Sequence, residues 1–266
     1  MSDSDWRSRL VSLLEPVGSR VVEAYGRTGP LRYKVGREAV THVDAEIERF
    51  LAERIRSDFP DHAVVGEEHG RSGPDGAEFE WHVDPVDGTL NYALGLPVFS
   101  VSVAVVRAGA IEAGAVVDPL RGDLYVAARG EGAWRGDERL AVSARSTLRE
   151  AIASFQSSRK GRFVRDAAIL QRVFTSISKV RRLGSVALEL AFVADGRFDL
   201  LLGSKRRAQN LYDVAAGVLL VEEAGGRVTD GRGRPFRAGA NEIVASNGHL
   251  HEAALELVGP AEGAGA

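Results

Sequence analysis

The sequence of 266 residues predicts a mixed α/β protein, and three observations carry this prediction. First, 44% hydrophobic and 27% charged residues are typical of a globular chain that is long enough to bury a sizeable core. Second, two helical patterns near the N-terminus are followed by several short β-branched segments, which indicates helices packed on an antiparallel sheet. Third, from about residue 150 strand patterns alternate with helical ones.

These patterns also predict how the chain is divided. We expect one domain over residues 1–258 with two lobes, about 1–148 (helices plus antiparallel sheet) and about 149–258 (alternating helices and strands). Residues 259–266 are expected to form a flexible tail, because small residues dominate them. No internal repeat and no long linker interrupts the sequence, so we expect the lobes to fold together.

Charge and cysteine usage argue against several classes of protein. With 34 Lys and Arg against 37 Asp and Glu, the formal net charge is -3, so no basic field argues for a nucleic-acid partner. Cysteine is absent, which excludes disulfides, thiolate nucleophiles and cysteine metal ligands. The first residues do not read as a leader, and no apolar run has the length of a membrane span. We therefore expect a cytoplasmic protein in which any metal is held by oxygen atoms or His.

Two amphipathic helices open the chain. Residues 6–25 carry apolar side chains at helical spacing, and Pro16 is expected to kink or break this helix. A second helix is predicted to follow Thr41 and to extend to about Ile55. Because Thr41 and Asp44 are spaced as in a capping box, Asp44 has a structural explanation beside any catalytic one.

The remaining elements of the first half are predicted to be strands. A short strand at residues 63–65 delivers Gly66-Glu67-Glu68 to a loop. The next strand runs through Val83 and is expected to end in a turn at Asp84-Pro85, because proline fixes its own φ and favours an extended residue before it. Further strands are predicted at residues 99–106, 113–117 and 124–128.

Strands and helices alternate in the second half. Strands are expected at residues 152–155, 179–183 and 198–202, and helices at 165–175, from Gly184-Ser185 to about 194, and at 212–224. Gly225-Gly226 is expected to close the last of these helices, since glycine suits a helix C-terminus. Asn247 could cap a final helix.

Residues 81–91 combine features of a metal site and a phosphate site. Asp84 and Asp87 lie three residues apart at the exit of a strand, and Gly88-Thr89 follows at once. Glycine lets a backbone approach a ligand closely, and the amides of Gly88 and Thr89 are placed to open a helix, where a phosphate binds favourably. The alternative is a common Asp-Pro turn with a solvated aspartate.

Four carboxylates share this context. Glu67 and the pair Asp84 and Asp87 follow strands, while Asp213 lies near the start of a helix. Like charges a few ångströms apart repel by roughly 4 kcal/mol per pair at an effective dielectric constant of 20, so such a cluster requires cations or protonation. Oxygen ligands without cysteine favour Mg²⁺ or Mn²⁺ over zinc.

No protein nucleophile is evident. The sequence contains no Gly-x-Ser-x-Gly elbow, no phosphate-binding Gly-x-x-x-x-Gly-Lys-Ser/Thr loop and no Gly-x-Gly-x-x-Gly after a strand. Haloacid-dehalogenase-type phosphatases place a nucleophilic aspartate two residues before the second one, and here that position is Pro85. A metal-bound water remains as the attacking group. We interpret His42, His69 and His82 as surface or packing residues rather than ligands.

Three motifs occur in order along the chain: Gly66-Glu67-Glu68; Trp81-x-x-Asp84-Pro85-x-Asp87-Gly88-Thr89-x-Asn91-Tyr92; and Asp213-Val214-Ala215-Ala216-Gly217 with Glu223-Ala224-Gly225-Gly226. Over about residues 6–257 the chain thereby resembles the inositol monophosphatase family. The resemblance implies a layered αβαβα sandwich of the sugar-phosphatase type and commonly a homodimer. It also implies a Mg²⁺-dependent and typically lithium-sensitive phosphatase, with Mn²⁺ as a substitute ion.

The resemblance assigns roles to individual residues. It implies metal ligands at Glu67, Asp84, Asp87, Asp213 and the Val86 carbonyl; catalytic roles for Asp44, Thr89 and Glu67, with Thr89 and Asp44 orienting and deprotonating the attacking water; and substrate binding by Asp87, Gly88, Thr89, Gly184 and Ser185. The Gly88 and Thr89 amides would hold the phosphate. Gly184 and Ser185 would line the leaving-group side.

Two departures from the family pattern bear on the substrate. Tyr212 stands where many relatives have Trp, which preserves an aromatic side chain. Residues 203–211, with Lys205, Arg206 and Arg207, are basic where many relatives have an acidic residue that binds substrate hydroxyls. These cations could attract a second phosphate, or they could form a solvated loop.

A small phosphorylated metabolite is the expected partner, and neither nucleic acid nor membrane is expected. Inositol 1-phosphate is the first expectation and fructose 1,6-bisphosphate the second, followed by histidinol phosphate and phosphoadenosine phosphate. A binding or regulatory homologue without catalysis is the alternative of a different class. A structural calcium site is the least expected alternative, because the residue spacing of an EF-hand is absent.

Overall fold

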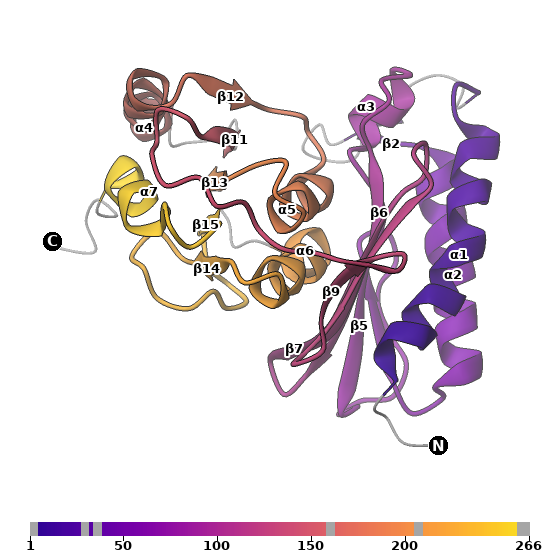
Figure 1. Ribbon diagram of the computed structural model, residues 1–266. Helices are drawn as coiled ribbons and strands as arrows, with labels where there is room; N and C mark the ends of the chain where they lie inside the picture. Colours follow the sequence, from indigo (N-terminus) through magenta and orange to yellow (C-terminus); the bar gives the residue numbers. More distant parts are fainter. Residues whose placement is uncertain (1–4, 28–31, 34–38, 158–162, 205–209, 260–266) are drawn as a thin grey trace, which may run out of the picture.

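The computed structural model describes residues 5–27, 32–33, 39–157, 163–204 and 210–259. The elements stack in five layers, helix–sheet–helix–sheet–helix, as Figure 1 shows from right to left. Three apolar cores fill the spaces: one under the outer helices of the first half, one around the middle helices and one under the outer helices of the second half. The αβαβα sandwich is therefore confirmed.

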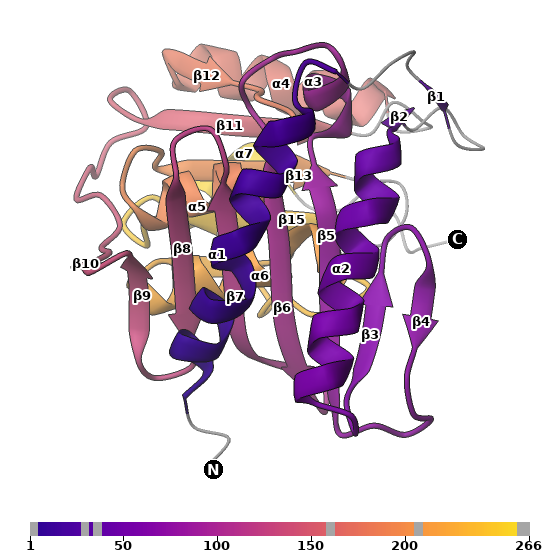
Figure 2. The ribbon, with the colours of Figure 1, turned by 90° about the vertical axis from the view of Figure 1, so that its right-hand side faces the viewer.

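The first outer layer consists of α1 (Trp6–Ala24) and α2 (His42–Asp58), which lie across one face of the large sheet (Figure 2). Of the two outcomes expected at Pro16, a kink or a break, the break does not occur, because α1 continues through Pro16. The helix buries Leu10, Leu14 and Val17 on both sides of Pro16, and this packing outweighs the hydrogen bond that proline cannot donate.

The large sheet has eight strands in the order β10-β9-β8-β7-β6-β5-β3-β4. Their bounds are β3 (Ala63–Gly66), β4 (Gly70–Ser72), β5 (Phe79–Asp87), β6 (Ser100–Arg107), β7 (Ala110–Asp118), β8 (Asp123–Ala128), β9 (Gly132–Arg135) and β10 (Glu138–Arg139). The expected antiparallel sheet is corrected in one respect, since β3 and β5 pair in parallel. Their carboxyl ends consequently lie at the same edge of the sheet.

The strand that carries the central motif does not end where the sequence suggested. β5 continues through Pro85 to Asp87, and its pairing with β6 shifts register between Asp84 and Asp87. Proline has no N–H to donate, so it is accommodated where the ladder is interrupted. Gly88, at φ +96°, then turns the chain into the short helix α3 (Thr89–Ala93).

The middle layer consists of α5 (Val186–Ala194) and α6 (Leu211–Glu223). These helices are apolar on all sides because both sheets pack against them. Close approach is possible where glycine replaces a side chain: an added Cβ on Gly217 would lie 2.4 Å from Leu190, and one on Gly114 would lie 2.6 Å from the Ala216 backbone.

The second sheet has five strands in the order β12-β11-β13-β15-β14. It comprises β11 (Ile152–Ser157), β12 (Lys179–Arg181), β13 (Leu200–Ser204), β14 (Arg227–Thr229) and β15 (Glu242–Ser246), and the outer layer of α4 (Phe163–Ser176) and α7 (His251–Val258) covers it. The predicted alternation of strands and helices is confirmed from β11 to α6. The strands β14 and β15 were not predicted. Asn247 does not directly precede α7; its side chain instead accepts a hydrogen bond from the Leu250 amide in the turn before the helix, at 3.1 Å.

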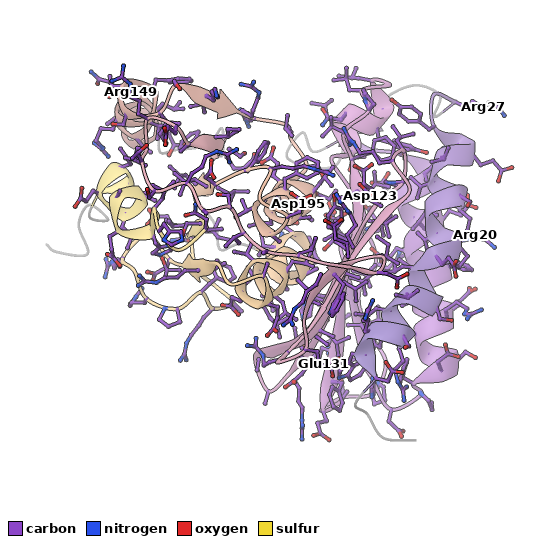
Figure 3. All side chains as sticks on the ribbon, in the orientation of Figure 1. Arg20, Arg27, Asp123, Glu131, Arg149 and Asp195 are labelled. Atoms are coloured by element: carbon purple, nitrogen blue, oxygen red, sulfur yellow. The ribbon has the colours of Figure 1, made fainter. Side chains whose placement is uncertain are left out.

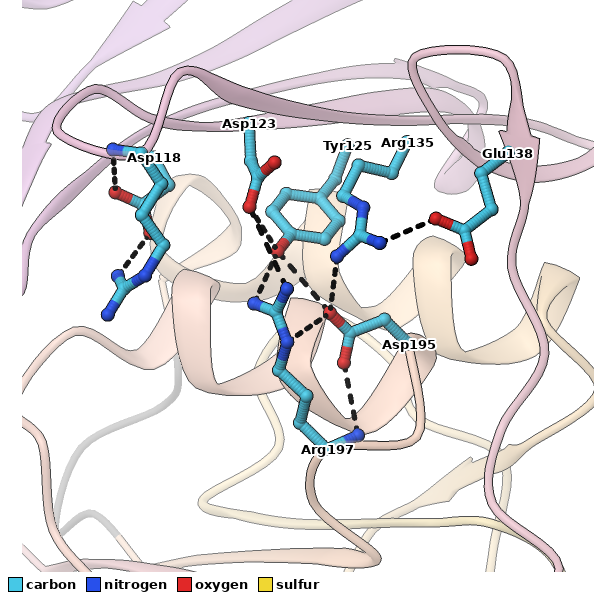
Figure 4. A network of polar contacts seen from close by, with 8 residues as sticks. Asp118, Asp123, Tyr125, Arg135, Glu138, Asp195 and Arg197 are labelled. Carbon is cyan, nitrogen blue, oxygen red and sulfur yellow. Dashed lines mark hydrogen bonds and ion pairs between the residues drawn. The ribbon is translucent and has the colours of Figure 1, made fainter.

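A charged network joins the large sheet to the end of α5 (Figures 3 and 4). Asp195, the residue that ends α5, lies 3.2 Å from the Nε of Arg197 and 3.7 Å from a guanidinium nitrogen of Arg135 on β9. Arg197 also donates to the Tyr125 hydroxyl on β8 at 3.0 Å. These contacts fix the middle layer against the sheet at the end away from the central motif.

Two minor features complete the fold. β1 (Arg32–Tyr33) and β2 (Ala39–Val40) form a two-stranded antiparallel sheet ahead of α2. Among the described residues, none of the helices is both long and apolar enough to cross a membrane.

Candidate active site

A cavity of about 320 Å³ opens where the large sheet, α5 and α6 meet. Residues from both halves of the chain line it: Glu67, Asp84, Val86, Asp87, Gly88, Thr89, Leu90, Gln156, Gly184, Val186, Asn210, Tyr212, Asp213 and Ile243. Eight of them lie within the motifs singled out from the sequence, and Tyr212 is adjacent to one of these motifs. Of the predicted site residues, Asp44 and Ser185 do not line the cavity. Each is hydrogen-bonded to a residue that does, Asp44 to Thr89 and Ser185 to Asp87.

Three of the predicted carboxylates converge in this cavity. Oxygen atoms of Glu67, Asp84 and Asp213 lie within 4.8 Å of one another. Glu67 follows β3 and Asp84 lies on β5, whose ends are brought together by parallel pairing, while α6 supplies Asp213 in its first turn. We call these three residues the acidic cluster.

The acidic cluster has the electrostatics of a cation site. Asp84 is buried, and burial raises its pKa well above the usual range, with repulsion from Asp87, Glu67 and Asp213 adding to the rise. Only oxygen donors converge, which suits a hard divalent cation such as Mg²⁺. The donor set therefore fits the ion that the sequence led us to expect.

Asp87 is oriented differently from the acidic cluster. Its two oxygens accept hydrogen bonds from the α5 amides of Val186 and Ala187, at 3.1 and 2.7 Å, and from the Ser185 hydroxyl at 2.7 Å. Burial raises its pKa to about 7, whereas these hydrogen bonds oppose the rise. The carboxylate thus lies at the positive end of a helix, which favours its charged form.

Asp44 and Thr89 form a contact between α2 and α3. Asp44 is buried, and one of its oxygens accepts from the Thr41 amide and hydroxyl, as in a capping box. Its other oxygen lies 3.0 Å from the Thr89 hydroxyl, which also lies 2.9 Å from the Val86 carbonyl. The structural and the catalytic interpretation of Asp44 are therefore compatible, because each uses a different oxygen.

Two glycines allow the two halves to meet at the cavity. An added Cβ on Gly88 would lie 3.1 Å from the Val98 carbonyl and 3.2 Å from that of Gly184, and both glycines have a positive φ. The Asn91 side chain donates to the carbonyls of Val98 and Leu183, at 2.7 and 2.6 Å, and so ties α3 to the segment before α5. The motif included Asn91, but its role in joining the halves was not predicted.

Glu48 is a site-supporting residue that the sequence analysis missed. Its buried carboxylate accepts from the amides of Glu68 and His69, at 2.7 and 2.8 Å, and lies 2.8 Å from the His69 ring. A Cβ on Gly66 would collide with Glu48. The available signal was its position one helical turn after Asp44, on the same face of α2.

The three histidines take no place in the cavity lining. His42 is exposed, and His69 contacts Glu48. His82 is buried, and among the described residues neither of its ring nitrogens has a hydrogen-bond partner. The basic residues Lys205, Arg206 and Arg207 lie outside the described residues.

Comparisons with known proteins bear on this arrangement. The sequence model of the inositol monophosphatase family matches residues 5–261. The chain is 37% identical to an inositol-1-monophosphatase of Rhizobium meliloti, 34% to a fructose-1,6-bisphosphatase/inositol-1-monophosphatase of Thermotoga maritima and 36% to the Nus factor SuhB of Pasteurella multocida. These alignments cover 94%, 93% and 91% of this chain and 94%, 93% and 88% of the relatives. A solved structure of a Thermotoga maritima IMPase, 34% identical, has a TM-score of 0.87 and covers 96% of both chains.

Proposed function

Because the chain belongs to the inositol monophosphatase family, we propose that it is a Mg²⁺-dependent phosphomonoesterase of small phosphorylated polyols. The observation that carries the proposal is the convergence of Glu67, Asp84 and Asp213 within 4.8 Å in a cavity. A protein without catalysis gains nothing from holding like charges together, since their repulsion lowers its stability. We take residues 1–258 as a single catalytic domain.

The metal would be held by the acidic cluster together with Asp87 and the Val86 carbonyl, with Mn²⁺ as a substitute for Mg²⁺. Bound there, the cation would supply positive charge to a phosphate group and to its leaving oxygen, and would lower the pKa of a water molecule. Asp87 would first have to share oxygens that now accept hydrogen bonds from α5. Its Oδ2 accepts from Ser185, Ala187 and Ser100, whereas among the described residues its Oδ1 accepts only from the Val186 amide, so Oδ1 has a lone pair to share.

Thr89 and Asp44 are proposed to position the attacking water, and Glu67 is proposed to take part in catalysis. A hydroxyl has one proton to donate, so the Asp44 oxygen and the Val86 carbonyl compete for that of Thr89. When Thr89 donates to Asp44, its oxygen can accept a hydrogen bond from water, and the proton of that water can pass to the Thr89 oxygen as the Thr89 proton passes to Asp44. Burial raises the pKa of Asp44, which makes it a better proton acceptor.

The phosphate and the leaving group are assigned to different walls of the cavity. The amides of Gly88 and Thr89 would bind phosphate oxygens. Gly184 would line the leaving-group side, and Ser185, which is buried next to it, would act through its hydrogen bond to Asp87. The leaving group would therefore contact the second half of the chain.

We propose inositol 1-phosphate as the first candidate substrate and fructose 1,6-bisphosphate as the second. Relatives of 34–37% identity carry names with one or both of these activities. Histidinol phosphate and phosphoadenosine phosphate are further alternatives. We also propose that the protein is cytoplasmic and that it forms a homodimer. Light scattering of the purified protein would test the oligomeric state.

The test is phosphate release from these four substrates with and without Mg²⁺, in parallel with Asp87→Asn. We expect Mg²⁺-dependent release from at least one substrate by the wild type and a loss on the order of 10²–10³-fold in the variant. Wild-type protein that binds Mg²⁺ but releases phosphate from none of them would contradict the proposal.

A second candidate is a role as a Nus factor, because a SuhB of that name is 36% identical. Because such a role is not a phosphate hydrolysis, we propose that it is independent of the acidic cluster and of the pair Asp44 and Thr89. If both functions coexist, Asp87→Asn abolishes phosphate release without affecting a transcription assay. A wild type active only in the transcription assay would favour this second candidate alone.

A further inference from the structure

Glu189 is a buried carboxylate beside the cavity with an unusual number of donors. It lies on α5 among apolar residues and is fully buried. One oxygen accepts from the amides of Leu183 and Gly184, at 2.5 and 3.0 Å. The other accepts from the Ser154 hydroxyl, at 2.6 Å, and from the side-chain amide of Gln156.

These four donors determine the orientation of the side-chain amide of Gln156. A carboxylate offers about four acceptor positions, and here each one meets a donor. An acceptor-only group must face the NH₂ of Gln156, since two carbonyl-type oxygens in contact would repel each other. The carbonyl oxygen Oε1 therefore points away from Glu189, and no described residue donates to it.

Gln156 occupies the leaving-group side of the cavity. It is half-buried near the end of β11, pairs with Gly203 on β13 and lines the cavity together with Gly184. Val186 and Ile243 on the same side offer no side-chain acceptor. Asn210 is exposed, and its amide donates to the Tyr212 hydroxyl at 2.7 Å.

We propose that Gln156 determines substrate specificity by accepting, through Oε1, a hydrogen bond from a hydroxyl of the leaving polyol. Glu189 is the positioning residue that keeps this oxygen turned to the cavity. The inference rests on the proposed phosphatase function. It names an acceptor in a chain whose segment 203–211 contains no acidic residue.

The first test compares Gln156→Leu with wild type on inositol 1-phosphate, or on whichever polyol phosphate the wild type hydrolyses fastest. Inorganic phosphate serves as an inhibitor that has no leaving group. We expect kcat/KM to fall about tenfold, the value of one lost hydrogen bond, while the inhibition constant of phosphate changes less than about twofold. Gln171→Leu, the same change on the exposed face of α4, is the matched control and should behave as wild type.

The second test separates positioning from mere structural support. Glu189→Gln can no longer accept all four hydrogen bonds, so the Gln156 amide is free to turn over. We expect a similar loss in kcat/KM through KM, with phosphate inhibition unchanged, and no further loss in the double variant with Gln156→Leu. The positioning role would be overturned if the losses of kcat/KM in the two single variants multiplied in the double variant. It would also be overturned if Glu189→Gln weakened phosphate inhibition as much as it lowered kcat/KM.

Failure of the inference is distinct from failure of the proposed function. If the wild type hydrolyses no phosphate ester, the phosphatase function is wrong and the specificity assignment falls with it. If the wild type is active and Gln156→Leu equals it on the polyol phosphate, the function stands and the assignment to Gln156 is wrong. An equal loss in kcat/KM and phosphate affinity also overturns the assignment.

Discussion

Two buried carboxylates beside the same cavity have opposite surroundings. Asp84, on the large sheet, faces Glu67 and Asp213, and repulsion adds to the rise of its pKa. Glu189, in the middle layer, faces four donors from two segments of the chain. Burial raises the pKa of both residues, but four hydrogen bonds oppose the rise at Glu189, whereas the described residues give Asp84 one hydrogen bond, from the Val86 amide at 3.1 Å.

This difference distinguishes a ligand site from a structural support. A carboxylate that the protein itself satisfies holds chain segments together, and removing it leaves buried donors without partners. A carboxylate held against like charges is stabilised when a cation binds or when a proton removes its charge. The same chemical group, buried in both places, is thus expected to respond to mutation with opposite changes in stability.

The largest expected effect is that of Asp84→Asn on catalysis. We expect kcat/KM with Mg²⁺ to fall on the order of 10³-fold, because a negative charge is lost from the acidic cluster. In the presence of EDTA the variant should be more stable than wild type by about 1–2 kcal/mol, which raises Tm by about 3–6 °C. Thermal unfolding that shows a lower Tm in EDTA would break the comparison.

Glu189→Leu should have the opposite effect on folding. The leucine leaves the amides of Leu183 and Gly184 and two side-chain donors without an acceptor, so we expect a loss of about 3–5 kcal/mol in the free energy of unfolding. Urea unfolding at neutral pH measures it, and Glu150→Leu, at an exposed position just before β11, is the control. A loss below about 1 kcal/mol would contradict the supporting role.

His251 extends the comparison to a buried group that is satisfied only when neutral. Its ring nitrogens contact the hydroxyls of Thr229 and Ser246, at 2.9 and 2.7 Å. Burial, with a smaller effect of Arg227, lowers its pKa from 6.5 to about 4. The unfolded chain therefore binds a proton before the folded one does, and stability falls as the pH drops from about 6.5 to 4.

The expected size of this effect is about 3 kcal/mol over that pH range. Urea unfolding of wild type and His251→Gln at several pH values measures the difference, because glutamine can replace the hydrogen bonds but does not titrate there. The variant should have a smaller pH dependence by about 1.4 kcal/mol per pH unit. Parallel curves for the two proteins would refute the prediction.

The smallest expected effect is that of the cation on stability. At a concentration of Mg²⁺ one hundred times its Kd, binding to the folded state alone adds about 2.7 kcal/mol, which corresponds to a rise of about 5 °C or more in Tm. Asp84→Asn should lose most of this rise, whereas Glu189→Gln should keep it. Equal responses of the two variants to Mg²⁺ would remove the distinction between the two carboxylates.

The sequence predicted the acidic cluster better than it predicted the backbone that carries it. Glu67, Asp84 and Asp213 stood out because each ends a strand or begins a helix, and the structure brings them together. The path of β5 through Pro85 was not predictable from local rules, because the register shift that accommodates proline depends on the neighbouring strand β6.

Unlike Glu48, Glu189 and Gln156 could not be found from spacing. Glu189 reads as one charged residue within an apolar helical stretch, and only the folded chain shows that Leu183 and Ser154 supply its donors. Gln156 belongs to no motif, and its orientation follows from that of Glu189. A solitary acidic residue in an otherwise buried helix was the available signal, and such residues are almost never buried without partners.

The order of the layers has a consequence for protein synthesis. The inner face of the large sheet, with Ala104, Val116 and Tyr125, is covered by α5 and α6, which the ribosome makes after the whole sheet. A nascent chain that ends near residue 140 therefore exposes this apolar face. At that stage of synthesis we expect a chaperone to find the largest exposed apolar surface. The acidic cluster also lacks Asp213 at that stage, so no nascent chain shorter than 213 residues carries the complete cluster.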